Sequence, residues 1–121
     1  MSERPVILVV DDDAPILLLM RNLLREFGFD PVTAASGPQA VEEAQRRTPD
    51  LVLLDRNMPG MSGDEVIAAI RSYGALASVP VLMLTGEPMD AEELRRLGAS
   101  GAVMKPFDVT ALVAMIRRHV N

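Results

Sequence analysis

Three consecutive aspartates follow an apolar stretch near the start of the chain. The run Val6–Val10 leads directly into Asp11, Asp12 and Asp13, and a helix-like apolar run follows at once. Adjacent carboxylates repel one another, so each raises the free-energy cost of ionising the next. Asp13 is placed to cap the following helix, and one cap suffices for one helix. Asp11 and Asp12 therefore need another partner, and a bound cation is the natural one.

Three further residues with useful chemistry come directly after later apolar runs: Asp55, Thr85 and Lys105. A carboxylate such as Asp55 can attack phosphorus and form an aspartyl phosphate. Lys105 would then place a point charge beside one phosphoryl oxygen, and the Thr85 hydroxyl would donate a hydrogen bond to another. Phosphoryl transfer depends mainly on positioning and charge neutralisation, and these side chains would provide both.

The cation expected beside these groups is Mg²⁺. It is a hard, octahedral ion that binds carboxylate oxygens, keeps some of its waters and remains open to phosphate. The chain has no cysteine and no suitably placed histidine, so no ligand set for a softer metal competes. The predicted carboxylate ligands are Asp11, Asp12 and Asp55.

Short apolar runs alternate with amphipathic segments along the whole chain, which predicts five strands and five helices. Several runs are nearly continuous in Val, Leu, Ile and Met, as in parallel strands that are covered on both faces. The strands are expected at residues 6–10, 31–34, 51–54, 81–84 and 102–104. The helices are expected to begin after five capping residues: Asp13, Ser36, Ser62, Asp90 and Asp108.

The first helix is expected to run to about Phe27, with Gly28 as its stop. Its apolar residues recur at helical spacing, which predicts a single stripe that faces the core. The residues assigned to this stripe are Ile16, Leu19, Met20, Leu23, Leu24 and Phe27.

The alternation of strands and helices predicts one α/β domain over residues 1–121. Its architecture is a (βα)5 three-layer sandwich with a five-stranded parallel sheet in the order 2-1-3-4-5. In such sheets, ligands bind beyond the carboxyl ends of the strands, where the strand order reverses. The strand at 31–34, which ends without obvious chemistry, then lies at an edge. The aspartates, Thr85 and Lys105 are expected to share one crevice.

The composition narrows the class of protein. The 121 residues are 49% hydrophobic with three Phe, one Tyr and no Trp, so the core must be aliphatic. The absence of cysteine excludes disulfides, thiol nucleophiles and zinc–thiolate sites. A net charge of −5 argues against nonspecific binding to nucleic acid, and no segment resembles a signal peptide or a membrane span. We expect a cytoplasmic location without direct contact to nucleic acid or membrane, and the chain is either a whole protein or a piece of a longer one.

Four motifs occur in order along the chain: ILVVDDD, PDLVLLDRNMPGMSG, VPVLMLTG and KPF. Together they resemble the receiver domains of two-component response regulators, those of chemotaxis type in particular, and the match covers essentially the whole chain. The resemblance implies a flavodoxin-like fold. It also implies a signalling domain rather than an enzyme, whose only reactions are its own phosphorylation and dephosphorylation.

The resemblance further implies roles for single residues. Asp55 would accept a phosphoryl group from a sensor histidine kinase or a histidine phosphotransfer protein. Asp11 and Asp12 would hold Mg²⁺ together with Asp55, and the backbone carbonyl of Asn57 would be a further ligand.

The same resemblance predicts how the signal would leave the site. Thr85 would move toward the phosphoryl group, Lys105 would bind it, and the peptide bond before Pro106 would be cis. A downstream effector protein or a fused output domain would read the change on the face of the fourth helix, fifth strand and fifth helix. That face is also where a homodimer would be expected.

Two features depart from the pattern of that family. Ala102 stands three residues before Lys105, where the family usually has Tyr or Phe, and the interval from Thr85 to Lys105 is shorter than usual. The common aromatic switch therefore cannot operate here, and we expect output through a modified fourth helix or another face such as the first helix. Asn57 and Glu87 match chemotaxis regulators with a short-lived phosphoryl group, which predicts fast self-dephosphorylation.

Two alternatives remain open at this point. A binding-only pseudo-receiver would keep the fold without accepting a phosphoryl group. A magnesium-dependent phosphatase of the haloacid dehalogenase type also uses an aspartate nucleophile. That class, however, places it after the first strand in an Asp-x-Asp pattern and usually adds a cap domain, for which 121 residues leave no room.

Overall fold

A computed structural model describes residues 3–120 of the protein. Within this range five strands alternate with five α-helices, and one 3₁₀ turn, η1 (Gly74–Leu76), precedes the fourth strand. The strands are β1 (Val6–Val10), β2 (Asp30–Ala34), β3 (Leu51–Asp55), β4 (Val81–Thr85) and β5 (Gly101–Met104). The helices are α1 (Ala14–Glu26), α2 (Gly37–Arg46), α3 (Gly63–Arg71), α4 (Ala91–Leu97) and α5 (Val109–Val120). No helix of residues 3–120 has the length and apolar character needed to cross a membrane.

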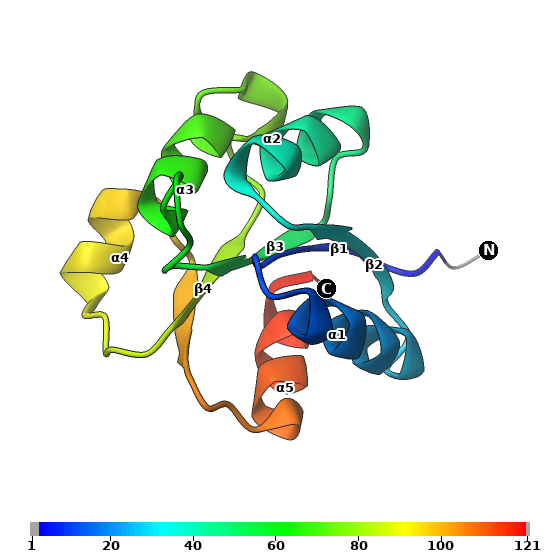
Figure 1. The fold of residues 1–121 in the computed structure, drawn as a ribbon. Helices are drawn as coiled ribbons and strands as arrows, with labels where there is room; N and C mark the ends of the chain where they lie inside the picture. Colours follow the sequence, from blue (N-terminus) through cyan, green and yellow to red (C-terminus); the bar gives the residue numbers. More distant parts are fainter. Residues whose placement is uncertain (1–2, 121) are drawn as a thin grey trace.

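All five strands pair in parallel, in the order β2-β1-β3-β4-β5. This order confirms the prediction and places β1 and β3 on either side of the point where the strand order reverses. In the register, Val10 lies beside Leu54, and Asp55 lies beside Leu84. The sheet lies between two layers of helices, with α1 and α5 on one face and α2, α3 and α4 on the other (Figure 1). The predicted three-layer sandwich is therefore confirmed.

Two aliphatic cores lie on opposite faces of the sheet, because successive residues of a strand point to opposite sides. Within β1, Leu8 and Val10 pack with residues of α2 and α3, whereas Ile7 and Val9 pack with residues of α1 and α5. The strands β1, β3 and β4 are buried along their whole length. The functional candidates that follow these strands are thus attached to the most enclosed part of the molecule.

The predicted capping residues lie at the starts of their helices. Four of them accept a hydrogen bond from the backbone N–H three residues further on: Asp13, Ser36, Ser62 and Asp90. Asp108 accepts one from the N–H of Thr110 at 2.9 Å. Four strands are one residue longer than predicted, and in β3 and β4 the added residues are Asp55 and Thr85. Both candidates therefore belong to the sheet itself.

The predicted buried stripe of α1 is partly wrong. Leu19 is 53% exposed, and Phe27, just beyond the helix, is 37% exposed. The residues of α1 that face the core are the buried Leu17, Met20 and Leu24, with Ile16 and Leu23 half-buried. Leucines occupy so much of the helix circumference that the apolar arc is wider than the arc that the sheet covers. Spacing alone therefore misplaced the centre of the buried face.

Candidate functional site

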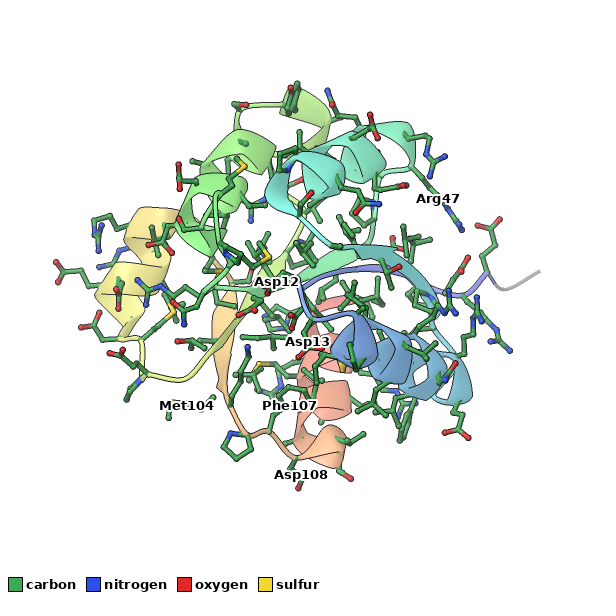
Figure 2. All side chains as sticks on the ribbon, viewed as in Figure 1. Asp12, Asp13, Arg47, Met104, Phe107 and Asp108 are labelled. Carbon is green, nitrogen blue, oxygen red and sulfur yellow. The ribbon has the colours of Figure 1, made fainter. Side chains whose placement is uncertain are left out.

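A cavity of about 520 Å³ opens at the carboxyl edge of the sheet. Figure 2 shows Asp12 and Asp13 at the start of α1, and Phe107 at the turn that leads into α5. Acidic, basic and apolar side chains line the cavity: Asp11, Asp12, Asp13, Ile16, Asp55, Leu84, Lys105, Pro106 and Phe107. Four of the predicted site residues, which come from three different strand ends, therefore share one cavity.

Three carboxylates from two neighbouring strands converge in this cavity. Asp11 and Asp12 follow β1, Asp55 ends β3, and one oxygen of each lies within 4.8 Å of the other two. Asp11 and Asp55 are each only 4% exposed, whereas Asp12 is exposed. Hard oxygen donors at this separation, open to solvent on one side, fit a divalent cation such as Mg²⁺ that keeps part of its water shell.

Lys105 is the only lysine in the chain, and its ammonium contacts Asp55. Its Nζ donates to Asp55 Oδ1 at 2.9 Å, and the backbone N–H of Asn57 donates to the same oxygen at 3.2 Å. The Lys105 side chain is 38% exposed and that of Asp55 is 5% exposed, so solvent reaches the ammonium more than the carboxylate. The Lys105–Pro106 peptide bond is cis, as the resemblance predicts.

Excess negative charge is the main electrostatic feature of the cavity, because four carboxylates and one ammonium line it. Burial raises the pKa of Asp11 above its ordinary value, and the charges of Asp55 and Asp12 raise it further. The backbone N–H of Asp13, which donates to Asp11 Oδ1 at 2.9 Å, and the ammonium of Lys105 oppose this shift without reversing it. The ionised form of Asp11 is therefore not fully compensated by the protein.

We expect Asp11→Asn to raise the free energy of unfolding of the metal-free protein at pH 7. A carboxyl whose pKa is higher in the folded state stabilises the fold while protonated, and loses that contribution as pH rises through the folded-state pKa. Asparagine does not ionise and can still accept the hydrogen bond from Asp13, so the variant should escape this loss. Urea unfolding in the presence of a chelator measures this gain in the free energy of unfolding. The gain should disappear at a pH well below 3.8, the ordinary pKa of an aspartate.

Asp13→Asn is the matched control for this measurement. It removes one charge from an exposed position and leaves a residue that caps α1 equally well. If both variants gained the same free energy of unfolding, the net charge of the chain would be responsible, and the position of Asp11 would not matter.

Thr85 ends β4 and is 1% exposed, but its hydroxyl is engaged away from Asp55. Its Oγ1 donates to the carbonyl of Glu87 and accepts from the N–H of Glu87, both at 3.1 Å. Thr85 lines a second, polar cavity of about 360 Å³, with Arg56, Asn57, Glu87, Pro88 and Glu93. Thr85 therefore lines a neighbouring cavity together with Asn57, and it is absent from the lining of the cavity that holds the three carboxylates.

Arg56 also belongs to this region, although no motif in the sequence singles it out. It directly follows Asp55, and its guanidinium forms ion pairs with Asp64 on α3 and Glu93 on α4. These hydrogen bonds, first to Asp64 and then to Glu93, raise the pKa of Arg56. The two partners lie 8 and 37 residues further along the chain, so no local spacing rule could have identified them.

Comparison with known proteins places this site in a family context. The family model for the response regulator receiver domain matches residues 7–117. The DNA-binding response regulator MtrA of Mycolicibacterium paratuberculosis is 40% identical over 120 residues, which are 98% of this chain and 52% of that protein. The sensory transduction protein RegX3 of Mycolicibacterium smegmatis is 37% identical over 113 residues, 92% of this chain and 48% of that protein. The chain thus spans about half the length of these relatives.

Solved structures agree with this comparison. The chemotaxis protein CheY4 of Vibrio cholerae superposes with a TM-score of 0.90 at 33% identity, over 96% of this chain and 98% of that chain. The receiver domain of the sensor histidine kinase PA1611 of Pseudomonas aeruginosa gives a TM-score of 0.87 at 27% identity, over 97% of this chain and 98% of that chain. The latter structure has a magnesium ion coordinated in its active site cleft.

Proposed function

This chain belongs to the response regulator receiver family, and on that premise we propose that Asp55 is the residue at which it accepts a phosphoryl group. As a receiver domain, it is a signalling module of a two-component system. We assign that role to residues 1–121 as one domain. The observation that supports Asp55 most strongly is its contact with the only lysine of the chain, beside two further carboxylates.

The proposed reaction transfers a phosphoryl group from a phosphorylated histidine to Asp55. A carboxylate oxygen of Asp55 attacks phosphorus, the new O–P bond forms as the P–N bond breaks, and the electron pair of the broken bond returns to the imidazole nitrogen. Lys105 is close enough to neutralise charge on the phosphoryl oxygens, and the N–H of Asn57 orients the carboxylate. The donor would be a sensor histidine kinase or a histidine phosphotransfer protein.

Mg²⁺ is the proposed cofactor. Asp11, Asp12 and Asp55 would hold it through their carboxylates, and the backbone carbonyl of Asn57 would be a further ligand. The convergence of three carboxylate oxygens within 4.8 Å supports this assignment, as does the magnesium ion in the related Pseudomonas aeruginosa domain. When bound, the ion would neutralise negative charge on the carboxylate and phosphoryl oxygens.

Added Mg²⁺ is expected to raise the melting temperature of the protein, because it would bind the folded site and relieve repulsion among the carboxylates. At a hundredfold excess over its dissociation constant, a ligand that binds only the folded state adds about 2.7 kcal/mol to the free energy of unfolding. Asp12→Asn should reduce this shift, whereas Asp13→Asn should preserve it. Thermal unfolding with and without Mg²⁺ at constant ionic strength measures both, and equal shifts in the two variants would count against Asp12 as a ligand.

Fast loss of the phosphoryl group to water is also part of the proposal. Asn57 and Glu87 line the polar cavity beside the loop that follows Asp55. Their side chains would admit and orient a water whose oxygen attacks phosphorus, which breaks the bond to the carboxylate and regenerates Asp55. The domain's own phosphorylation at Asp55 and this self-dephosphorylation are the only chemistry that we assign to it.

Thr85 is the proposed reporter of the phosphoryl group. Its hydroxyl would have to release the backbone of Glu87, which it now contacts as donor and acceptor, before it could bond a phosphoryl oxygen. Ala102 is half-buried and has no ring that could follow such a movement. Output would therefore pass through a modified α4 surface, or another face such as α1, to an effector protein or a fused output domain.

The remaining assignments concern the surroundings of the domain. We place it in the cytoplasm, where histidine phosphotransfer would occur, without direct contact to nucleic acid or membrane. Its net charge of −5 supports the first of these exclusions. Self-association as a homodimer would use the face formed by α4, β5 and α5.

Incubation with Mg²⁺ and acetyl phosphate, followed by intact mass measurement, tests the proposed function. One phosphoryl adduct should form, should require Mg²⁺, and should decay after the donor is removed. Absence of an adduct despite bound Mg²⁺ would indicate a binding-only pseudo-receiver. Continuous release of phosphate from many phosphomonoesters would indicate a phosphatase, and an adduct that persists for hours would contradict fast self-dephosphorylation.

A further inference from the structure

Arg56 connects the end of β3 to two helices through one guanidinium. Its Nε and Nη2 donate to the two carboxylate oxygens of Asp64 at 3.1 and 3.3 Å, and Nη2 also donates to Glu93 Oε2 at 2.9 Å. The Arg56 side chain is only 22% exposed. Its backbone N–H donates to the carbonyl of Leu84 on β4 at 3.0 Å. Arg56 is therefore fixed to the sheet and α3, and from there reaches α4.

The first half of α4 has few other attachments. This seven-residue helix has no fully buried side chain. At its far end, half-buried Leu97 packs against the core beside α2 and α3, and Arg71 donates two hydrogen bonds to the carbonyl of Gly98 at 3.2 and 2.8 Å. Glu93 lies in the first turn, away from these contacts. The ion pair with Arg56 is thus the main polar contact between that turn and the rest of the domain.

The ion pair and the Thr85 hydroxyl border the same cavity. Arg56, Glu93, Thr85 and Glu87 all line it. The loop from Glu87 leads to Asp90, whose side chain caps α4 through the N–H of Glu93 at 2.8 Å. Release of Glu87 by Thr85 would therefore displace a loop that ends at Asp90, the residue that caps α4 through the N–H of Glu93.

We propose that the Arg56–Glu93 ion pair is a latch that holds α4 in the arrangement of the unphosphorylated protein. The inference rests on the proposed function, because phosphorylation of Asp55 supplies the event that the latch opposes. The bidentate contact with Asp64 keeps Arg56 in place, and the contact with Glu93 is the part that yields. The latch gives α4 a link to the acceptor that does not depend on an aromatic side chain at position 102.

Thermodynamic linkage between the ion pair and phosphoryl binding determines whether loss of the latch strengthens or weakens that binding. A contact that favours the unphosphorylated arrangement must weaken the binding of a phosphoryl group, and its removal must strengthen that binding by the same factor. For a partly exposed ion pair we expect a factor of about two to five.

The test titrates beryllofluoride, an analogue of the phosphoryl group, in the presence of Mg²⁺ while amide NMR signals are recorded. Glu93→Gln removes the charge and keeps the shape, and Glu92→Gln makes the same change at an exposed neighbour. Glu93→Gln should lower the half-saturating concentration about two- to fivefold, as estimated for a partly exposed pair. Before any addition, its α4 signals should already lie closer to those of the saturated wild-type protein. Glu92→Gln should match the wild type in both respects.

Two results would overturn the latch, and they are distinguishable. If the wild-type protein binds beryllofluoride and Glu93→Gln does not differ from Glu92→Gln, the latch alone is wrong. If the wild-type protein binds no beryllofluoride and forms no adduct with acetyl phosphate, the proposed function fails and the latch fails with it.

Discussion

Asp55→Asn is expected to abolish phosphoryl incorporation while the protein stays folded. An amide oxygen is a poor nucleophile and forms no stable acyl phosphate, so phosphorylation at this position should stop instead of only slowing. The side chain keeps its size, and its oxygen can still accept from Lys105 and from the N–H of Asn57. The variant also removes one of the four carboxylates that line the cavity with a single ammonium, so the metal-free fold should not lose stability. Intact mass after incubation with acetyl phosphate and Mg²⁺ should return to background.

Asp13→Asn is the control for this loss. It makes the same chemical change on the wall of the same cavity, but at an exposed cap for which we propose no role in the reaction. It should incorporate phosphate like the wild type. Incorporation that persists in Asp55→Asn would move the acceptor to another carboxylate, with Asp11 and Asp12 the nearest candidates.

Lys105→Met is expected to slow phosphorylation by about 100-fold or more, the usual effect of removing one donor that stabilises developing charge. Methionine keeps a flexible side chain of similar length but cannot replace the ammonium that lies 2.9 Å from Asp55. No second lysine exists in the chain to take over this charge. The rate of adduct formation, measured at a fixed donor concentration, gives the size of the effect.

The Mg²⁺-dependent melting temperature of the same variant shows whether Lys105 acts on the phosphoryl group or on the binding of Mg²⁺. Loss of the ammonium leaves the three carboxylates uncompensated, so Mg²⁺ should still raise the melting temperature, by at least as much as in the wild type. Arg118→Met, which removes a cation from an exposed position in the last turn of α5, should change neither quantity. Wild-type phosphorylation in Lys105→Met would contradict a role for this residue in binding the phosphoryl group.

The cavity at the edge of the sheet could be predicted because it depends on strand ends. Parallel strands all point their carboxyl ends to one edge, so residues that directly follow buried apolar runs must gather there. The closeness of Asp11 and Asp55 follows directly from the fact that β1 and β3 are neighbours in the sheet. The helix caps were equally local, since a cap such as Ser62 contacts a backbone group three residues away.

Other features depend on contacts that a single sequence does not record. The apolar residues of α1 cover more of the helix surface than the sheet buries, and only the packing of the helix decides which of them are covered. Leu19 was assigned to the buried side for this reason, but it is exposed. The Thr85 hydroxyl has a backbone partner, Glu87, and only the path of the loop after β4 determines that choice. The pairing of Arg56 with Glu93 requires α4 to lie beside the end of β3, which no periodicity predicts.

Chemical location of the phosphoryl group decides whether Asp55 is the acceptor. Borohydride reduces an acyl phosphate to a primary alcohol, which converts the acceptor aspartate to homoserine and marks its position. The tryptic peptide of residues 48–56 contains Asp50 and Asp55, and fragment-ion sequencing distinguishes them. Asp50 serves as an internal control, because its carboxylate accepts a hydrogen bond from the N–H of Val6 at 2.7 Å and we propose no reaction there. Conversion at Asp55 alone, and only with Mg²⁺ and donor present, is the predicted result; conversion at any other aspartate, or none, would contradict it.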